Sequence, residues 1–318
     1  MNGILGLKYS ADLRTLFFVG LNFVVIGSAW YFYPHLPWYG VMPFVIACCV
    51  LSYISAVITH NTVHVPIFRG KTANRIFQFV LSLSYGNAVS TFVTGHNLSH
   101  HMHAQTPKDP ARTQKMRFKW NFLNQALFLF RMVKAILYFE DIFIKKMKKE
   151  YPRWYRQFLM ESILVHGVAV ILIFVDWQRW GLFIFLPRLY AVWGILGSNF
   201  FQHDGCDETS EYNHSRNFTG WFFNGLLFNN GYHTIHHMQP NLHWTLLPEY
   251  HKKLVEPYIH PNLCQNNMFF YLWKTLIWPG KRVDYLGNPL VYPPLEQDQD
   301  WSEGLNISEH EYALGAVY

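Results

Sequence analysis

The stretch that decides the fold is residues 37–64, PWYGVMPFVIACCVLSYISAVITHNTVH. Residues 37–58 are almost entirely apolar, and about 20 such residues are enough for a helix to cross the hydrocarbon core of a bilayer. The apolar run ends just before His60 and His64, which are four residues apart and would share one face if the helix continued. The stretch therefore predicts a membrane-spanning helix with two imidazoles where it leaves the membrane.

Three other segments have the same apolar character. Residues 15–33 are joined to the first stretch by a short link, and residues 158–175 and 181–201 flank the polar sequence DWQRW. Two neighbouring spans with a short link form a hairpin, so these segments predict two transmembrane hairpins. The composition agrees, because 51% of the residues are hydrophobic and only 14% are charged, against roughly 25% charged residues in soluble domains. The sequence predicts an all-α integral membrane protein with about four transmembrane helices.

Three further segments do not fit a simple span. Residues 76–93 are apolar but interrupted by SYGNAVS, which indicates an interfacial segment or an incomplete span. Residues 121–144 mix apolar side chains with charged ones, a pattern typical of an amphipathic helix on a membrane surface. The acidic C-terminal sequence PPLEQDQDWSEGLNISEHE predicts a loosely packed tail.

The distribution of basic residues predicts the orientation. Half of the 26 Lys and Arg residues lie within residues 103–157, whereas the two hairpin tips hold only Arg179. Because cytoplasmic loops carry the excess of Lys and Arg, residues 59–157 and 202–318 are predicted to be cytoplasmic. The basic residues alternate with aliphatic ones beside spanning segments, so they indicate a membrane surface and argue against a nucleic-acid partner. We therefore expect residues 1–318 to form a single membrane domain with a cytoplasmic helical cap.

Nine of the 17 histidines fall, together with one asparagine, into four short groups on that predicted cytoplasmic side. The groups are HNTVH, HNLSHH, NFFQH and HTIHH, and each has two members four residues apart, as two ligands on one helix face require. His101 follows His100 directly, so it needs a distorted turn or a second ion. The candidate metal ligands are His60, His64, His96, His100, His101, Asn199, His203, His233, His236 and His237.

Chance is a poor explanation for these groups. At the histidine content of this chain, HxxxHH and HxxHH are each expected about 0.05 times. A structural zinc takes four ligands and a catalytic zinc three, so nine imidazoles suit two ions with four or five ligands each. Imidazole binds Zn, Cu, Fe and Ni, so the ligand type alone leaves the metal open. His103, Asp204 and His243 lie close to the groups in sequence and are candidates to orient the ligands.

A metal transporter or metal-storage protein is the alternative of a different class. Such a protein would place histidines along its spans, near the bilayer midplane. Here only His166 lies within a predicted span. The sequence therefore favours an enzyme with a two-metal site at the cytoplasmic face.

The order and spacing of the four groups resemble the membrane-bound fatty acid desaturases and hydroxylases, the histidine-box di-iron superfamily. The resemblance runs from about residue 37 to residue 250 and includes the context HTIHHMQPNLHW. By position, the nine histidines match the metal ligands of that family, and Asn199 matches its asparagine ligand. Asn229, four residues before His233, is a second candidate asparagine.

This resemblance implies a cofactor, an oxidant, an electron donor and a substrate class. The cofactor is a pair of non-haem iron ions, and the oxidant is molecular oxygen as co-substrate. Two electrons come from an external donor of the ferredoxin, rubredoxin or cytochrome b5 type. The substrate is a lipid or acyl chain, such as a fatty acid, acyl-CoA, acyl-carrier conjugate or acyl-lipid, which the protein holds near the metal while it excludes water.

The signals for the subfamily point in two directions. HTIHH is typical of desaturases, whereas HNLSHH and the following TPKDPAR are similar to membrane alkane and xylene hydroxylases. Those hydroxylases have Glu where this chain has Gly95, so the sequence departs from both patterns. The resemblance implies an O2-dependent oxidation of an unactivated C–H bond, with desaturation as the first interpretation. Hydroxylation by a monooxygenase, oxidative decarboxylation to a terminal alkene and carotenoid oxidation are the alternatives.

Overall fold

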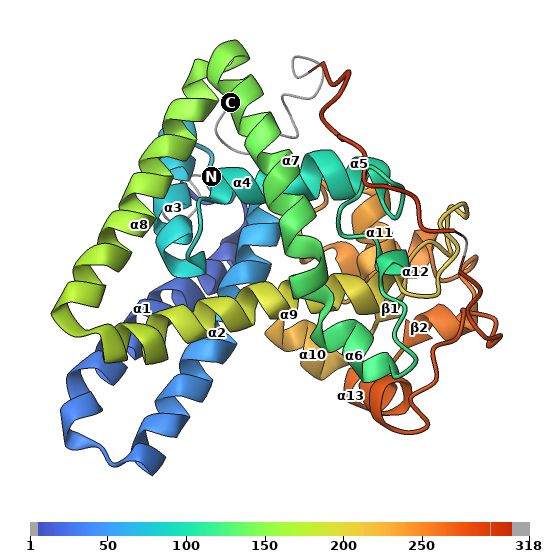
Figure 1. The fold of residues 1–318 in the computed structure, drawn as a ribbon, viewed down its shortest axis with the longest axis horizontal. Coiled ribbons are helices and arrows are strands. Elements are labelled where there is room, and N and C mark those ends of the chain that lie inside the picture. Colours follow the sequence, from blue (N-terminus) through green and yellow to red (C-terminus); the bar gives the residue numbers. More distant parts are fainter. Residues whose placement is uncertain (1–5, 293, 307–318) are drawn as a thin grey trace. The chain divides into compact units, whose positions relative to one another are not determined.

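The computed structural model describes residues 6–292 and 294–306, and most of them are helical (Figure 1). The α-helices are α1 (Leu13–Phe32), α2 (Trp38–His64), α3 (Lys71–Tyr85), α4 (Val89–Val93), α5 (His101–His103), α6 (Asn121–Ala126), α7 (Phe128–Glu150), α8 (Pro152–Trp180), α9 (Leu186–His203), α10 (Trp221–Leu226), α11 (His233–Met238), α12 (Leu247–Leu254) and α13 (Met268–Leu272). Three segments are π-helical, Thr94–His100, Gly181–Phe185 and Trp273–Ile277. Four short segments are 3-10 helices, Ser10–Asp12, Tyr33–His35, Thr113–Lys115 and Pro261–Leu263. Two short strands pair in parallel, β1 (Asn217–Phe218) and β2 (Cys264–Gln265). The predominantly helical class expected from the sequence is confirmed.

The chain divides into two compact units. The described part of the first unit is residues 6–94 and 142–195 together with Asn306, and the second unit is residues 95–141 and 196–305. The first unit contains α1 and α2, and the second contains three of the four histidine groups.

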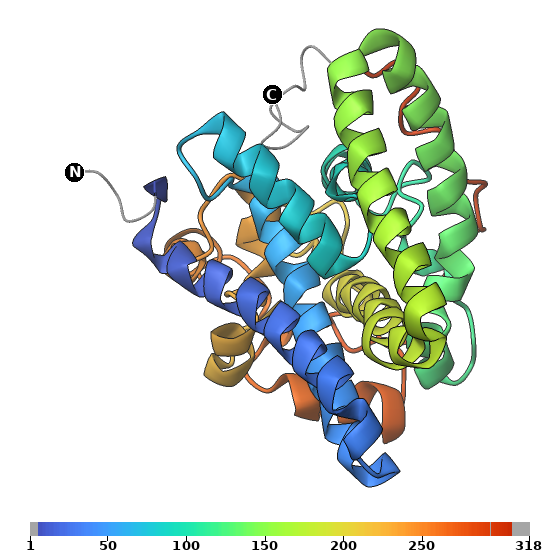
Figure 2. The ribbon, with the colours of Figure 1, turned by 90° about the vertical axis from the view of Figure 1, so that its left-hand side faces the viewer.

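Helices α1 and α2 run side by side in the first unit (Figures 1 and 2). Ala29 of α1 packs with Cys48 of α2 and with Phe183 from the π-helical turn before α9. Small side chains at such a contact let two helices approach closely. Helix α2 extends past the predicted end of its span at residue 58, so His60 and His64 both lie on its last turns.

Three helical segments of the described chain are long and apolar enough to cross a membrane. They are Ser10–His35, Trp38–His64 and Pro152–His203, and a fourth is added if Lys71–Tyr85 and Val89–His103 are counted as one bent span. The first two segments agree with the spans expected at 15–33 and 37–58. Long apolar helices are therefore present where the sequence predicted the first hairpin.

The third segment is interrupted at Asp176, between the predicted spans 158–175 and 181–201. Asp176 has non-helical backbone angles, with φ −163° and ψ 98°. Its Oδ1 accepts hydrogen bonds from the backbone N–H groups of Gln178 and Arg179 at 3.1 and 3.0 Å, the pattern of a helix N-cap. The chain turns sharply after α8 (Figure 1). The polar sequence DWQRW is thus a helix break with a cap.

The interrupted apolar segment at 76–93 consists of two helices. Helix α3 ends at Gly86, whose φ of +95° is the left-handed conformation that glycine adopts without strain. The helical segment Val89–His103, which begins with α4, continues at an angle of 89°. Arg188 of α9 donates from Nη2 to a carbonyl oxygen in the last turn of α3 at 2.7 Å. The buried carboxylate of Glu161 in α8 accepts from the backbone N–H of Ser90 at 3.0 Å. Helices α8 and α9 therefore hold both sides of the predicted break.

Alanine at Gly86 is expected to destabilise the first unit. At this φ an L side chain is strained, and its Cβ would lie 2.2 Å from Cδ of Arg188. A left-handed non-glycine residue costs about 1–3 kcal/mol, so we expect a lower thermal unfolding midpoint in detergent. Alanine at Gly27 of α1, which has open space around it, should not lower the midpoint. An unchanged midpoint for Gly86→Ala would contradict this account of the break.

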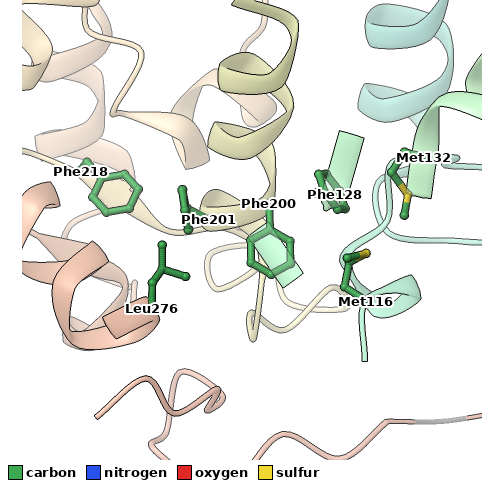
Figure 3. Close-up of a cluster of buried hydrophobic side chains, with 7 residues drawn as sticks. All are labelled: Met116, Phe128, Met132, Phe200, Phe201, Phe218 and Leu276. Atoms are coloured by element: carbon green, nitrogen blue, oxygen red, sulfur yellow. The ribbon is translucent and has the colours of Figure 1, made fainter. Parts of the chain in front are cut away.

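One hydrophobic cluster of the second unit is largely aromatic (Figure 3). The rings of Phe128 in α7 and Phe200 in α9 pack with their centroids 5.2 Å apart. This packing fixes the last turn of α9, which ends at His203. The buried side chains of the cluster are Met116, Phe128, Met132, Phe200, Phe201, Phe218 and Leu276.

The C-terminal stretch is packed where the sequence predicted a loose tail. Asp298 pairs with the buried Arg112, and it accepts a hydrogen bond from Nζ of Lys115 at 2.9 Å. Trp301 and Ser302 are buried as well. The prediction is therefore wrong at Asp298, Trp301 and Ser302, whereas residues 294–297 and 303–304 are exposed as expected of a loose tail. The rest of it, from residue 307, lies outside the described residues.

Candidate metal centre

A π-helical turn at residues 94–100 carries the second histidine group. Hydrogen bonds in a π-helix run between residues five apart, so these residues share one face. His96 and His101 are five apart, and their Nε2 atoms are 3.1 Å from each other. The i,i+4 spacing predicted that His96 would pair with His100, but in the structure its partner is His101. The distorted turn expected from the adjacent His100 and His101 is confirmed, and it sends the two neighbours to different clusters.

The four-histidine cluster consists of His100, His203, His233 and His237. One ring nitrogen of each lies within 4.8 Å of those of the others. The Nε2 atoms of His203 and His233 are 2.9 Å apart, and those of His233 and His237 are 3.1 Å apart. The four rings come from the π-helical turn, the end of α9 and helix α11. The second, third and fourth histidine groups thus converge, as the sequence predicted.

A buried carboxylate, Asp109, orients one ring of the four-histidine cluster. It accepts a hydrogen bond from Nδ1 of His100 at 2.9 Å and others from the backbone N–H groups of Gln105 and Ala111 at 3.0 and 2.8 Å. Burial alone would raise the pKa of Asp109, but His100 and these donors outweigh it and hold the pKa below its usual value. The hydrogen bond to Asp109 places a proton on Nδ1 of His100, so in the neutral form of the ring the lone pair is on Nε2. This Nε2 is buried and has no hydrogen-bond partner within the described chain.

Asparagine at Asp109 is expected to weaken metal binding by about 10- to 100-fold. An amide has one acceptor oxygen, so it cannot hold the imidazole of His100 and both backbone donors together. Competition with a graded chelator measures the metal affinity of the purified protein. Glu249→Gln, which removes an exposed carboxylate of the same unit, should leave the affinity unchanged. Equal affinities for the wild type and Asp109→Asn would show that Asp109 does not orient the ligand.

The three-histidine cluster consists of His96, His101 and His236. Nε2 of His101 lies 3.1 Å from Nε2 of His96 and 3.0 Å from Nε2 of His236. This cluster adjoins the four-histidine cluster, because the rings of His101 and His237 stack with their centroids 4.3 Å apart. Two adjoining sets of imidazoles are the arrangement that a two-metal site requires.

The first histidine group lies in the first unit, on the last turns of α2. The rings of His60 and His64 have their centroids 5.6 Å apart, so the two side chains share one face as their spacing predicted. Nδ1 of His60 is 3.0 Å from Oδ1 of Asn61. An amide oxygen accepts, so Nδ1 donates there, and in the neutral form of the ring the lone pair of His60 is on Nε2.

The protonation of the clustered rings suits metal binding. Burial, and then the neighbouring His101 and His233, lowers the pKa of His237 well below its ordinary value. The ring of His237 is therefore neutral near pH 7, and neutral imidazole is the form that binds metals. Nδ1 of His203 is 3.2 Å from the carbonyl oxygen of His214. Since that oxygen accepts, Nε2 of His203 faces the cluster with its lone pair.

The nitrogen positions fit metal ions shared between the rings. Two nitrogens bound at right angles to one ion, each at about 2.0–2.1 Å, would lie about 2.9 Å apart. The close Nε2 pairs in the two clusters are 2.9–3.1 Å apart. The donor set consists of imidazoles, which suit Zn, Cu, Fe and Ni. The residues present therefore fit a pair of transition-metal ions.

The two predicted asparagines make backbone contacts through their amide nitrogens. Nδ2 of Asn199 donates to the carbonyl oxygen of Ala111 at 3.2 Å. Asn229 has a positive φ of 58°, and its Nδ2 donates to the carbonyl oxygen of Trp244 at 2.9 Å. These hydrogen bonds use the nitrogen of each amide and not its oxygen, which is the atom that would bind a metal.

Three residues were predicted to orient metal ligands, namely His103, Asp204 and His243. The carboxylate of Asp204 binds the guanidinium of Arg282, with Nε 2.8 Å from Oδ2, where the sequence suggested an imidazole. The ring of His243 hydrogen-bonds to Oγ1 of Thr245 at 2.8 Å. Burial lowers the pKa of His103, which is thereby held neutral near pH 7. Asp204 thus serves the packing of the second unit.

Comparison with known proteins connects these clusters to a family. The family model of the fatty acid desaturases matches residues 15–263 of this chain. The chain belongs to the fatty acid desaturase family. The match includes all four histidine groups. No match was found among curated proteins.

Membership of the fatty acid desaturase family accounts for the histidine groups and for the apolar segments of the sequence. The family acts on lipid or acyl substrates in membranes, and the described chain has three or four apolar helices long enough to cross one. This desaturase-family protein is therefore an integral membrane protein of the oxidoreductase type.

Proposed function

We propose that this desaturase-family protein is a membrane di-iron oxidoreductase that uses O2 and external electrons to desaturate an acyl chain. The observation that carries the proposal is the pair of adjoining histidine clusters in a chain of this family. Oxidising an unactivated C–H bond with O2 needs a redox-active metal. Zinc has no redox chemistry, so among the metals that suit imidazole we favour iron, which the family resemblance implies.

The proposed ligands divide between two ions. The four-histidine cluster holds one ion, and the three-histidine cluster holds the other with His60 and His64 as further ligands. Asn199 contributes an amide oxygen. We assign three of these ligands from the order of the histidine groups in the sequence, namely His60, His64 and Asn199.

The protein's own groups prepare the site for the reaction. Two bound irons would supply the redox chemistry by which O2, with two external electrons, oxidises the C–H bond. Asp109 keeps His100 in one orientation and one tautomer. The burial of His100, His203 and His233 keeps bulk water away from the reacting methylene.

The proposed topology has four spans in two hairpins and a metal centre on the cytoplasmic face, with residues 1–318 as one functional domain. The break at Asp176 supports it, because it divides a segment of 52 residues into two parts. Each part exceeds the roughly 20 residues that a span requires. The excess of basic residues in 103–157 supports a cytoplasmic orientation for that segment.

Hydroxylation is the second candidate reaction. The loop TPKDPAR is similar to that of membrane hydroxylases, and it is the loop that places Asp109 against His100. Desaturation, hydroxylation and oxidative decarboxylation all begin with removal of a hydrogen and differ in the next step. The product therefore distinguishes them.

The fatty-acid profile of a host that expresses the protein with a ferredoxin and its reductase tests the proposal. Mass spectrometry should detect a new double bond that depends on O2. The product should be absent with His236→Ala and present with His35→Ala, which changes an exposed histidine outside the clusters. A hydroxylated product would favour the second candidate. A product formed by His236→Ala would contradict the role of the clusters.

A further inference from the structure

The second unit carries an exposed apolar surface that the proposed reaction does not use. It is formed by α10 and by α13 with the π-helical turn that follows it. Trp221 is 84% exposed, Trp278 is 75% exposed and Phe269 is 68% exposed. We name this surface the aromatic patch, and its side chains are those of Trp221, Phe222, Phe269, Phe270, Trp273, Ile277 and Trp278.

The backbone holds the two halves of the aromatic patch firmly together. Strands β1 and β2 pair directly before α10 and α13, and Thr219 donates its backbone N–H to the carbonyl oxygen of Gln265 at 2.9 Å. Gly220 allows a close approach, because a Cβ there would lie 2.1 Å from the carbonyl oxygen of Asn266. Asn267 caps α13 through a hydrogen bond from the N–H of Phe270 at 2.9 Å. The patch is therefore a fixed surface.

The helices of the aromatic patch are apolar on both sides. Their inner side chains, including Phe223, Met268 and Tyr271, pack against the core that contains Phe218 and Leu276 (Figure 3). Their outer side chains are the large aromatic residues of the patch. Large exposed apolar side chains on the outer side of a helix mark a surface that contacts an apolar environment there.

The length of this segment excludes a span. Met268–Ile277 is an apolar helical segment of ten residues, and at 1.5 Å per residue it extends about 15 Å, half the thickness of the hydrocarbon core. Such a segment can lie in the plane of the interface, with its apolar face about 5–10 Å deep. Tryptophan, which contributes three side chains to the patch, is enriched at that depth.

The charges around the aromatic patch suit an anionic surface. Residues 215–228 and 265–283 contain no Asp or Glu, whereas Lys274 and Lys281 are exposed beside the exposed rings. Lysines near a membrane surface are attracted to anionic headgroups. A protein partner would meet the same apolar side chains, but three exposed tryptophans and two exposed lysines in segments without Asp or Glu are typical of a lipid-facing surface.

We propose that the aromatic patch inserts into the boundary between headgroups and acyl chains of one leaflet, as a second membrane contact besides the spanning helices. The lipids that it contacts are phospholipids, with a preference for anionic headgroups. The proposal rests on the integral membrane character of the protein and not on the reaction that the metal centre performs.

Fluorine NMR of the full-length protein in nanodiscs tests this contact. The protein is labelled with 5-fluorotryptophan, and single substitutions Trp221→Phe, Trp273→Phe and Trp278→Phe assign the three resonances. We expect all three to be broadened by a phospholipid spin-labelled near its headgroup and to be little affected by a gadolinium chelate in the water. Broadening by the chelate alone would overturn the proposal. Protection from both agents would overturn it too, because a protein would then cover the patch.

Two native tryptophans serve as internal controls. Trp301 is buried in the second unit and should respond to neither agent, whereas Trp38 lies exposed on the first turn of the spanning helix α2 and should respond to the spin-labelled lipid. A silent Trp38 would mean that the protein is not in the membrane, which separates a failed premise from a failed proposal. In the Lys274→Gln/Lys281→Gln variant, the stronger broadening expected in anionic than in neutral nanodiscs should disappear. Wild-type broadening that is equal in both lipids would overturn the headgroup preference.

Discussion

Alanine at His100 is expected to abolish acyl oxidation and to reduce bound iron from about two ions to about one per chain. The substitution removes one of the four rings whose nitrogens lie within 4.8 Å of one another. It removes the ring that Asp109 orients from 2.9 Å away, and the Nε2 that is buried without a hydrogen-bond partner in the described chain. The three-histidine cluster keeps all of its rings, so one ion should remain.

Elemental analysis of purified protein and product analysis measure the two effects of His100→Ala. His35→Ala changes an exposed histidine and should retain both the iron and the activity. In the single variant the buried carboxylate of Asp109 loses its partner, which would disturb the loop. The double variant His100→Ala/Asp109→Ala removes this carboxylate as well. If the double variant bound two irons, the cluster would not be a metal site. Full activity of His100→Ala would be equally contradictory.

Methionine at Arg282 is expected to destabilise the second unit by about 3–5 kcal/mol. The guanidinium binds both carboxylate oxygens of Asp204 and donates to the carbonyl oxygens of Thr113 and Met116. Both side chains of the ion pair are only 7% exposed. Methionine fills similar space without donors, so a charged carboxylate would be left buried without its partner. Asp204 directly follows His203, so the protein should also retain less iron.

Denaturant and thermal unfolding in detergent measure the effect of Arg282→Met. The matched control is Lys253→Met, which breaks an ion pair with Glu249 that is exposed on both sides and should not measurably change stability. Adding Asp204→Asn to Arg282→Met should recover part of the loss, because it removes the buried charge. Equal stability of Arg282→Met and Lys253→Met would refute the role of this ion pair.

The long helices and the histidine groups could be predicted because their signals are local. A run of apolar residues such as 37–58 is sufficient for a long helix whatever surrounds it. The spacing of HTIHH places His233 and His237 on one turn, and the structure puts both in the four-histidine cluster. The interruption SYGNAVS predicted an interfacial segment or an incomplete span, and Gly86 within it has the positive φ at which α3 ends.

The division of the histidines between two clusters depends on the π-helical turn, which spacing alone does not reveal. An α-helical reading of HNLSHH pairs His96 with His100, whereas the wider turn brings His96 to His101. The adjacent histidines were the one local sign of this distortion. Residues that follow each other directly cannot point to the same place on a regular helix.

The partners of the polar groups around the site were missed because they are distant or irregular in sequence. Asp109 lies in a loop, and only the sequence TPKDPAR marked it. Asp204 was expected to orient an imidazole, but it binds Arg282, 78 residues away. Asp298 meets Arg112 and Lys115 across 186 and 183 residues. Composition indicated a loose acidic tail there because it contains no information about such partners.

Iron content measured together with O2-dependent product formation is the most direct test of the metal centre. The wild-type protein purified in detergent should contain about two iron ions per chain. A chelator should remove the activity, and Fe(II) should restore it. Zn(II) should not, because zinc binds imidazole but has no redox chemistry. Acyl oxidation by iron-free protein, or activity restored by zinc, would contradict the proposal that the histidine clusters form a di-iron centre.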